Sequence, residues 1–155
     1  MSKPGFAIAV VDDEKPVRTA LGRLLRAAGL EVWTFGSGQE FLTSLEKRRP
    51  DCAILDLHLP GLSGLDLQLY LSRERAGLPC IIITGKDEPG TRERVLAAGA
   101  AAYLKKPFDE EALFQAISMA VPGCLEKESR AESTALKLIE NVADSKTIIL
   151  NGGVA

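Results

Sequence analysis

Four short apolar runs in this chain each end in polar residues that can carry chemistry. The runs are residues 6–11, 52–55, 80–83 and 100–104, and they lead into Asp12-Asp13-Glu14, Asp56, Thr84-Gly85 and Lys105-Lys106-Pro107. The two central runs are apolar without alternation, as expected for strands that are buried on both faces. If all four are parallel strands of one sheet, their polar ends converge on one edge, where open α/β sheets place their sites.

Stretches with helical periodicity separate these runs. Strands are expected at 6–11, 31–35, 52–55, 80–83 and 101–104, and helices at 14–28, 38–48, 64–75, 90–98 and 109–121. The first helix shows an apolar stripe that includes Val17, Leu21 and Leu25, and it ends at Gly29, a common C′ residue. Asp109 is a good N-cap for the last helix. The alternation predicts an α/β fold, a parallel sheet with helices on both faces.

Composition narrows the classes of protein that fit. The chain has 155 residues, enough for one domain with a core and a short appendage, and 46% of them are apolar. Its net charge of −2 provides no basic field for nucleic acid, and no apolar stretch approaches the roughly 20 residues of a membrane span. The N-terminus lacks the apolar segment of a signal peptide. Three cysteines without a Cys-x-x-Cys pair indicate neither zinc nor a disulfide framework, so the cytoplasm is the expected location.

Residues 122–155 differ from the alternating part. Pro122-Gly123 ends the last periodic helix, and residues 126–144 form a charged stretch with one apolar helical face. Residues 146–150 are a candidate short strand. We expect a C-terminal extension, mainly helical, whose role the sequence leaves open. Thirty-four residues are too few for a helix-turn-helix output domain, although the extension could be the linker of a longer transcription factor.

The three aspartates Asp12, Asp13 and Asp56 would lie within a few ångströms of one another at the sheet edge. At about 5 Å and an effective dielectric constant of 20, each pair of carboxylates repels by roughly 3 kcal/mol. A cation would relieve this repulsion, and hard oxygen ligands in an open site suit Mg²⁺. The alternative is that one of the first two aspartates only caps the following helix.

The ordered set Asp12-Asp13, Asp56, Thr84 and Lys106-Pro107 resembles the receiver domain of bacterial response regulators, the CheY-like family, over residues 5–121. The resemblance implies a doubly wound, five-stranded parallel sheet with strand order 2-1-3-4-5. It also implies a Mg²⁺ site. In that site Asp13 binds the metal directly, Asp12 binds it through water, and Asp56 and the backbone carbonyl of His58 contribute further oxygens.

The same resemblance makes Asp56 the phosphoacceptor, which receives its phosphoryl group from a phosphohistidine of a sensor kinase or a phosphotransfer protein. Lys106 and Thr84 would contact the phosphoryl group, Tyr103 would swing inward behind Thr84, and the Lys106–Pro107 bond would be cis. The chain would catalyse only its own phosphorylation and dephosphorylation. It would signal to a downstream protein, or by self-dimerisation, through the face made by the fourth helix, fifth strand and fifth helix, without contacting nucleic acid or membrane.

Three other interpretations remain open from the sequence. A Mg²⁺-dependent phosphohydrolase of the haloacid-dehalogenase type also uses Asp, Thr and Lys, but it places Asp-x-Asp after the first strand, and here His58 stands two residues after Asp56. An interaction module that has lost phosphorylation would lack one of the motif residues, and none is lacking. The chain is also compatible with a receiver fragment of a longer DNA-binding response regulator.

Two cysteines stand at matching distances from the predicted site. Cys52 lies four residues before Asp56, and Cys80 lies four residues before Thr84. If Asp56 and Thr84 are in register on neighbouring strands, the two cysteines are neighbours on one face of the sheet, within the range that disulfides span. We expect reduced and buried thiols rather than a redox pair.

Overall fold

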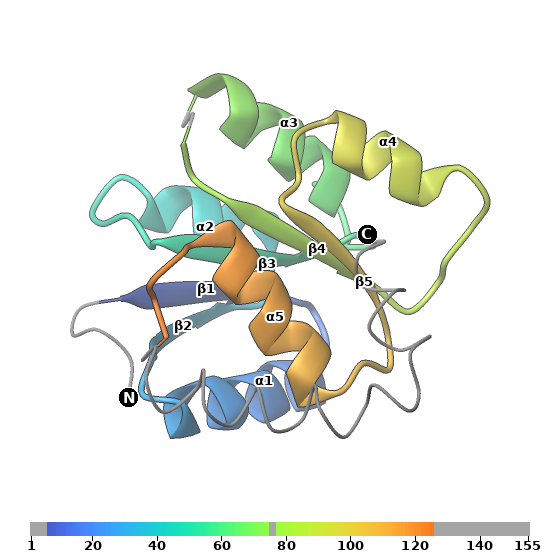
Figure 1. Cartoon of the computed structure of the whole chain (residues 1–155). Helices are drawn as coiled ribbons and strands as arrows, with labels where there is room; N and C mark the ends of the chain where they lie inside the picture. The colour runs from blue at the N-terminus through green and yellow to red at the C-terminus, as the bar shows by residue number, and fades with distance from the viewer. Residues whose placement is uncertain (1–5, 75–76, 126–155) are drawn as a thin grey trace, which may run out of the picture.

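The computed structural model describes residues 6–74 and 77–125 of the chain, and in this part five strands form one parallel sheet (Figure 1). The strands are β1 (Ala7–Val11), β2 (Glu31–Phe35), β3 (Cys52–Asp56), β4 (Cys80–Thr84) and β5 (Ala102–Lys105). The helices are α1 (Lys15–Ala27), α2 (Gly38–Ser44), α3 (Gly64–Glu74), α4 (Thr91–Ala97) and α5 (Glu110–Ala120). The strand order β2-β1-β3-β4-β5 confirms the predicted doubly wound fold.

Helices cover both faces of the sheet, and two separate apolar cores result (Figure 1). On one face α1 and α5 contribute side chains such as Leu25 and Leu113 to the first core. On the other face α2, α3 and α4 contribute side chains such as Phe41, Leu67 and Val95 to the second core. Every residue of β1, β3 and β4 is buried, which explains why these runs lack the alternation of a one-sided strand.

Local signals fix most of the helix ends. Asp109 caps α5 as predicted, because its Oδ1 accepts a 2.8 Å hydrogen bond from the backbone N–H of Ala112. Helix α2 ends at Ser44, four residues before the predicted end, because the backbone N–H groups of Glu46 and Lys47 bond three residues back and tighten the chain into a turn. No helix within the described ranges is long and apolar enough to cross a membrane.

The register of β3 and β4 corrects one expectation. Cys80 pairs with Ala53, and Asp56 pairs with Ile83, so Thr84 lies one residue beyond the level of Asp56. A shift of one residue changes the face to which a side chain points. Cys52 therefore packs in the α1/α5 core and Cys80 in the α2/α3/α4 core, and the prediction that they share a face is wrong. Both thiols are free and buried, as expected.

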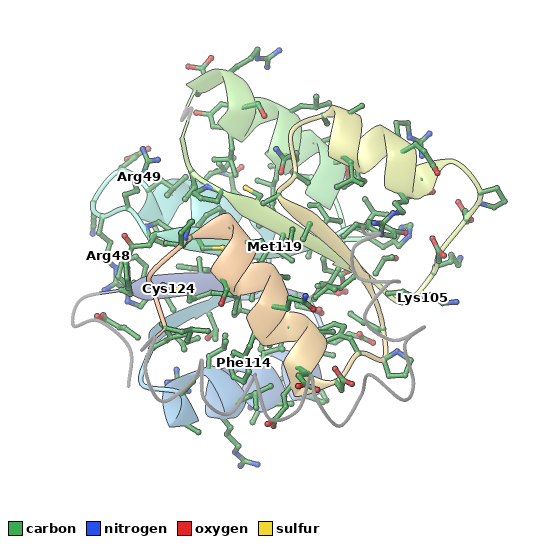
Figure 2. The ribbon with its side chains drawn as sticks, viewed as in Figure 1. Arg48, Arg49, Lys105, Phe114, Met119 and Cys124 are labelled. Carbon is green, nitrogen blue, oxygen red and sulfur yellow. The ribbon has the colours of Figure 1, made fainter. Side chains whose placement is uncertain are left out.

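The described chain continues for five residues past α5. Cys124 and Leu125 are buried there and belong to the α1/α5 core, and Figure 2 shows Cys124 beyond the end of the helix that carries Phe114 and Met119. The helix predicted over residues 126–144 and the strand predicted over 146–150 lie outside the described residues.

Candidate functional site

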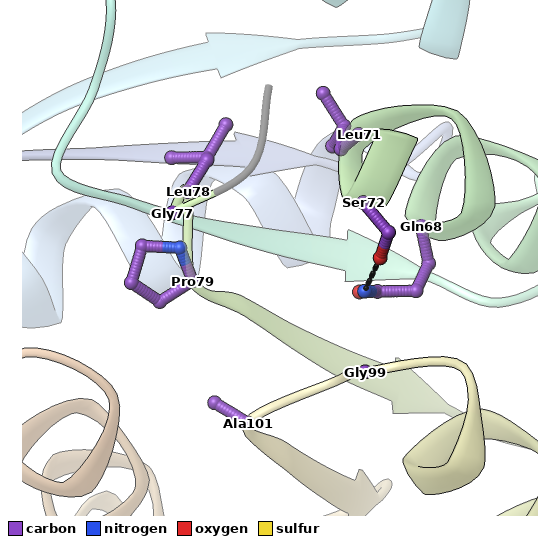
Figure 3. A pocket seen from close by; sticks show the side chains of 8 residues that line it. All are labelled: Gln68, Leu71, Ser72, Gly77, Leu78, Pro79, Gly99 and Ala101. Atoms are coloured by element: carbon purple, nitrogen blue, oxygen red, sulfur yellow. Dashed lines mark hydrogen bonds between the residues drawn. The ribbon is translucent and has the colours of Figure 1, made fainter. Parts of the chain in front are cut away.

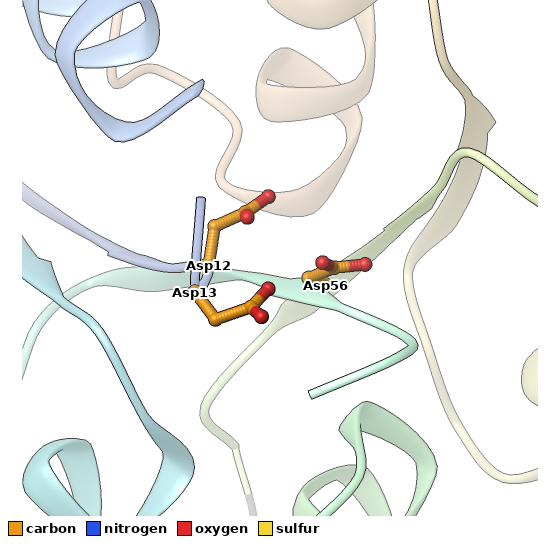
Figure 4. A group of neighbouring side chains, drawn as sticks. All are labelled: Asp12, Asp13 and Asp56. Atoms are coloured by element: carbon orange, nitrogen blue, oxygen red, sulfur yellow. The ribbon is translucent and has the colours of Figure 1, made fainter. Parts of the chain in front are cut away.

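Three aspartates meet at the carboxyl ends of β1 and β3. Val11 pairs with Leu55, so Asp12, the next residue, comes to the level of Asp56 at the end of β3. One ligand oxygen from each of Asp12, Asp13 and Asp56 can be chosen so that all three lie within 4.8 Å of one another (Figure 4). Asp12 is fully buried and Asp56 is nearly so, whereas Asp13 is exposed. The predicted carboxylate cluster therefore exists and opens to solvent through Asp13.

The three carboxylates carry more negative charge than the neighbouring protein groups neutralise. Burial raises the pKa of the Asp56 carboxyl above its ordinary value, and the nearby charge of Asp12 raises it further. The backbone N–H of His58, which donates to Asp56 Oδ1 at 3.3 Å, and the charge of Lys106 act against this rise without cancelling it. A further cation bound at the three carboxylates would complete the neutralisation.

Lys106 places its ammonium group beside the cluster. Its Nζ lies 3.0 Å from Asp12 Oδ2, 3.5 Å from Glu14 Oε1 and 3.7 Å from Asp56 Oδ2. Burial alone would lower the pKa of Lys106, but the hydrogen bond to Asp12 and the charges of Asp56, Asp12 and Glu14 outweigh that effect and raise it. The lysine is therefore cationic in this site, 18% exposed and within reach of a group bound to Asp56.

The backbone after β5 sets the direction of the Lys106 side chain. Lys105, the last residue of β5, is exposed (Figure 2), and the chain bends at the next residue. The backbone N–H of Lys106 donates a 2.7 Å hydrogen bond to the carbonyl of Thr84, which ties the loop to the end of β4. The peptide bond between Lys106 and Pro107 is cis.

The hydroxyl of Thr84 is hydrogen-bonded to the backbone of the turn that follows β4. Thr84 Oγ1 accepts a 3.0 Å hydrogen bond from the backbone N–H of Lys86 and donates a 3.1 Å bond to the carbonyl of the same residue. Thr84 is fully buried at the end of β4. To donate to a group on Asp56, the hydroxyl has to give up its bond to the carbonyl of Lys86, whereas it can still accept from the backbone N–H of that residue.

Tyr103 points into the molecule on the neighbouring strand β5. Its side chain is 7% exposed, and its hydroxyl donates a 2.8 Å hydrogen bond to Asp87 Oδ1 in the loop between β4 and α4. The guanidinium carbon of Arg92 lies 6.0 Å from the ring centroid. Burial and then the hydrogen bond to Asp87 raise the pKa of this tyrosine well above its ordinary value. The ring is thus held inward by a contact that the sequence did not indicate.

The donor set at the cluster fits a hard divalent cation. Carboxylate oxygens with an open, solvated side are the ligands that Mg²⁺ takes in proteins, and the three aspartates offer them within 4.8 Å. The structure does not support the alternative that Asp12 or Asp13 only caps α1. The N-cap residue of α1 is Glu14, no side chain caps that helix end, and Asp12 Oδ1 accepts from the backbone N–H of Glu14 before the helix begins.

Arg18 and Gly64 shape the site but escaped the sequence interpretation, and Glu14 was named there only as a polar residue after the first apolar run. Arg18 on α1 donates a 2.6 Å hydrogen bond from Nη1 to the carbonyl of Asp12, and Glu14 shares Lys106. A Cβ at Gly64 would collide with the carbonyl oxygen of Asp56, so α3 packs this closely against the end of β3 only with glycine there. Gly64 is the first residue of α3 rather than an interior one, so the sequence held no clear signal of this close approach.

Comparisons with known proteins agree with this geometry. The family model described as "Response regulator receiver domain" matches residues 8–118. The chain is 41% identical over 110 residues to nodulation protein W of Bradyrhizobium diazoefficiens, which covers 71% of this chain. It is 35% identical over 131 residues to response regulator protein TodT of Pseudomonas putida, which covers 84% of this chain.

A solved structure of a response regulator receiver protein from Burkholderia phymatum superposes with a TM-score of 0.70 at 40% sequence identity. The match covers 78% of this chain and 98% of that one. The two curated relatives are longer, since the matched regions cover only 48% of nodulation protein W and 58% of TodT. The chain thus spans about half the length of these relatives.

Proposed function

The chain belongs to the response regulator receiver domain family, and from that premise we propose that Asp56 accepts a phosphoryl group and switches the domain between two signalling states. The observation that carries the proposal is the placement of Lys106 Nζ 3.7 Å from Asp56 Oδ2, beside two further carboxylates. A nucleophilic carboxylate, a fixed cation and a candidate metal site thus lie at one edge of the sheet, and phosphoryl transfer requires these parts.

The donor is a phosphohistidine of a sensor kinase or of a phosphotransfer protein. An Asp56 carboxylate oxygen forms the new O–P bond, the N–P bond of the phosphohistidine breaks, and the released imidazole takes a proton. The transition state is loose and demands little from the nucleophile, so a carboxylate suffices. Lys106 stabilises the negative charge on the transferred oxygens.

Four groups of this chain would hold Mg²⁺. They are the carboxylates of Asp12, Asp13 and Asp56 and the backbone carbonyl of His58, with Asp13 as a direct ligand and Asp12 as a ligand through water. When bound, the ion supplies positive charge to the phosphoryl oxygens and offsets the repulsion among the carboxylates.

The response to phosphorylation runs through Thr84 and Tyr103. A phosphoryl group on Asp56 offers the Thr84 hydroxyl a charged acceptor in place of the carbonyl of Lys86. The β4–α4 loop, which also holds Tyr103 through Asp87, would move with that exchange. Phosphorylation thereby favours one of two pre-existing arrangements. A downstream protein or a second copy of the chain would bind the face made by α4, β5 and α5, and the rearrangement would change its affinity for that face.

The chain would turn over no free substrate apart from small phosphoryl donors that modify Asp56, and it would make no direct contact with nucleic acid. Its free cysteines fit the cytoplasmic location that the sequence predicts. A second candidate function is the receiver part of a longer DNA-binding response regulator, and the incomplete coverage of the curated relatives favours it. Either way, the chemistry at Asp56 is the same.

Intact-mass spectrometry after incubation with acetyl phosphate and Mg²⁺ tests the proposal. We expect one added phosphoryl group on the native chain, none on Asp56→Asn and an undiminished addition on Asp66→Asn, which alters an aspartate in the first turn of α3. Equal labelling of Asp56→Asn and the native chain would rule out the assignment. Steady release of product from p-nitrophenyl phosphate would favour the phosphohydrolase instead.

A further inference from the structure

A cavity lies at the end of the sheet opposite the carboxylate cluster, between α3, the segment before β4 and the loop that joins α4 to β5 (Figure 3). Its volume is about 330 Å³, at the lower end of the range of small-molecule sites. The residues that line it are Gln68, Leu71, Ser72, Gly77, Leu78, Pro79, Gly99 and Ala101. None of these eight residues is charged, and none belongs to the site described above.

Gln68 brings an unpaired acceptor to this cavity. The residue lies on α3 and is 3% exposed, and its amide points toward the space between Pro79 and Gly99 (Figure 3). Its Nε2 donates to Ser72 Oγ at 3.2 Å and to the carbonyl of Ala98 at 3.4 Å. Its Oε1 is buried and has no hydrogen-bond partner among the described residues. Buried amide oxygens are seldom left unpaired, because burying one without a partner costs free energy.

The orientation of the amide follows from its surroundings. The carbonyl of Ala98 accepts hydrogen bonds and already receives one from Ser72 Oγ at 3.1 Å. Reversing the amide would turn Oε1 toward that carbonyl oxygen and place two acceptors against each other. The neighbouring Gly99 leaves room for the amide, since it has a φ of +108° and a Cβ there would come within 3.2 Å of Ser72 Oγ and 3.4 Å of Gln68 Nε2.

We propose that this cavity binds a small neutral molecule that has an apolar body and donates one N–H or O–H hydrogen bond to Gln68 Oε1. Leu71, Leu78, Pro79 and Ala101 would contact the apolar body. The eight lining residues carry no charge that could pair with a charged ligand. The proposal does not depend on phosphorylation of Asp56, and its test needs no phosphoryl donor.

Indole and 1-methylindole are matched probes for the proposed hydrogen bond, because they share an apolar ring system and only indole has an N–H. Each is titrated into the ¹⁵N-labelled full chain while the backbone amides and the Gln68 side-chain amide are followed by NMR. We expect indole to shift the signals of Gln68, Gly99 and Ala101. We expect 1-methylindole to bind about tenfold more weakly, the loss that one hydrogen bond to an otherwise unpaired acceptor produces.

Two variants separate the hydrogen bond from the cavity itself. Gln68→Met keeps a side chain of similar size without an acceptor, so the two probes should bind it with equal affinity. Ala101→Leu fills the cavity and should abolish the shifts of the Gln68 side-chain amide. Gln115→Met, at an exposed position on α5, should change neither affinity.

Equal affinities of the native chain for the two probes would overturn the proposal. So would the absence of localised shifts up to the solubility limit of indole, which would mean that the Gln68 oxygen is satisfied by water alone. Both results are obtained on the native chain, so they stand even if a variant fails to fold.

Discussion

The Nζ atom of Lys106 lies 3.0 Å from Oδ2 of Asp12, although 94 positions separate the two residues in the sequence. Asp12 is fully buried, and its other carboxylate oxygen, Oδ1, accepts from the backbone N–H of Glu14. The ion pair therefore joins the ends of β1 and β5 across the carboxylate cluster, and removing the lysine leaves buried negative charge without its cation.

Replacing that lysine should destabilise the metal-free chain at neutral pH. We expect Lys106→Met to lower the free energy of unfolding by about 2 kcal/mol, because Asp12 and Asp56 lose a charged partner. Lys105→Met, one residue earlier and exposed, should change it by less than about 0.5 kcal/mol. Urea unfolding in the presence of a chelator measures both. Equal midpoints for the two variants would show that the ion pair contributes nothing.

Removal of Asp13 should weaken Mg²⁺ binding at least tenfold while leaving the metal-free chain no less stable. The variant Asp13→Ala loses a proposed ligand, and it also loses the repulsion that Asp13 exerts on Asp12 and Asp56. The gain in stability should be at most about 1 kcal/mol, because water screens the charge of this exposed side chain. Isothermal titration with Mg²⁺ and urea unfolding test the two effects, with Glu46→Ala as an exposed acidic control. A less stable metal-free variant would instead assign Asp13 a structural role.

The contact between Tyr103 and Asp87 should be visible in the titration of the tyrosine. Burial and the Asp87 hydrogen bond raise the pKa of Tyr103, and the second cause disappears in Asp87→Ala. The pKa should then fall toward the ordinary tyrosine value near 10, whereas Asp87→Asn, which keeps an acceptor, should give an intermediate value. NMR of the ring signals, with Tyr70→Phe to remove overlap, measures the change. An unaltered pKa in Asp87→Ala would show that the contact is absent in solution.

Thr84 should couple the phosphoryl group to Tyr103. In Thr84→Ala we expect Asp56 to be labelled by acetyl phosphate nearly as in the native chain, because Thr84 supplies neither the nucleophile nor the Lys106 cation. The chemical-shift changes at Tyr103 on adding a phosphoryl mimic should be lost in this variant and kept in Thr84→Ser, which retains the hydroxyl. Identical shifts in the alanine variant and the native chain would contradict the coupling.

The three cysteines should react slowly in the native state. Burial raises the pKa of Cys80 to about 12 and that of Cys124 to about 11, and it raises the pKa of Cys52 further. Little reactive thiolate therefore forms near neutral pH. A thiol reagent should label all three rapidly in denaturant and very slowly without it. A Cys52–Cys80 cross-link after mild oxidation would contradict the structure, which places these two side chains in cores on opposite faces of the sheet.

Local patterns predicted the elements and the convergence of the site because both follow from short stretches of sequence. The apolar runs mark β1, β3, β4 and β5, and parallel strands necessarily bring Asp12, Asp56, Thr84 and Lys106 to one edge. Figure 4 and the distances to Lys106 agree with that expectation.

The features that the sequence did not predict depend on contacts between distant segments. The register of β4 against β3 is set by backbone pairing that begins at Ala53 and Cys80, and equal spacing from Asp56 and Thr84 did not reveal it. The bond from Tyr103 to Asp87 and the close approach of Gly64 to Asp56 likewise arise only when the elements pack.

The most direct test of the account is to locate the phosphoryl group on the native chain. After incubation with acetyl phosphate and Mg²⁺, reduction with borohydride converts a phosphorylated aspartate to homoserine, and peptide mass spectrometry identifies the position. We predict that the conversion occurs at Asp56 alone and disappears when Mg²⁺ is removed with a chelator. Conversion at Asp12 or Asp13, or no conversion under any condition, would contradict the claim that this chain is a switch operated through Asp56.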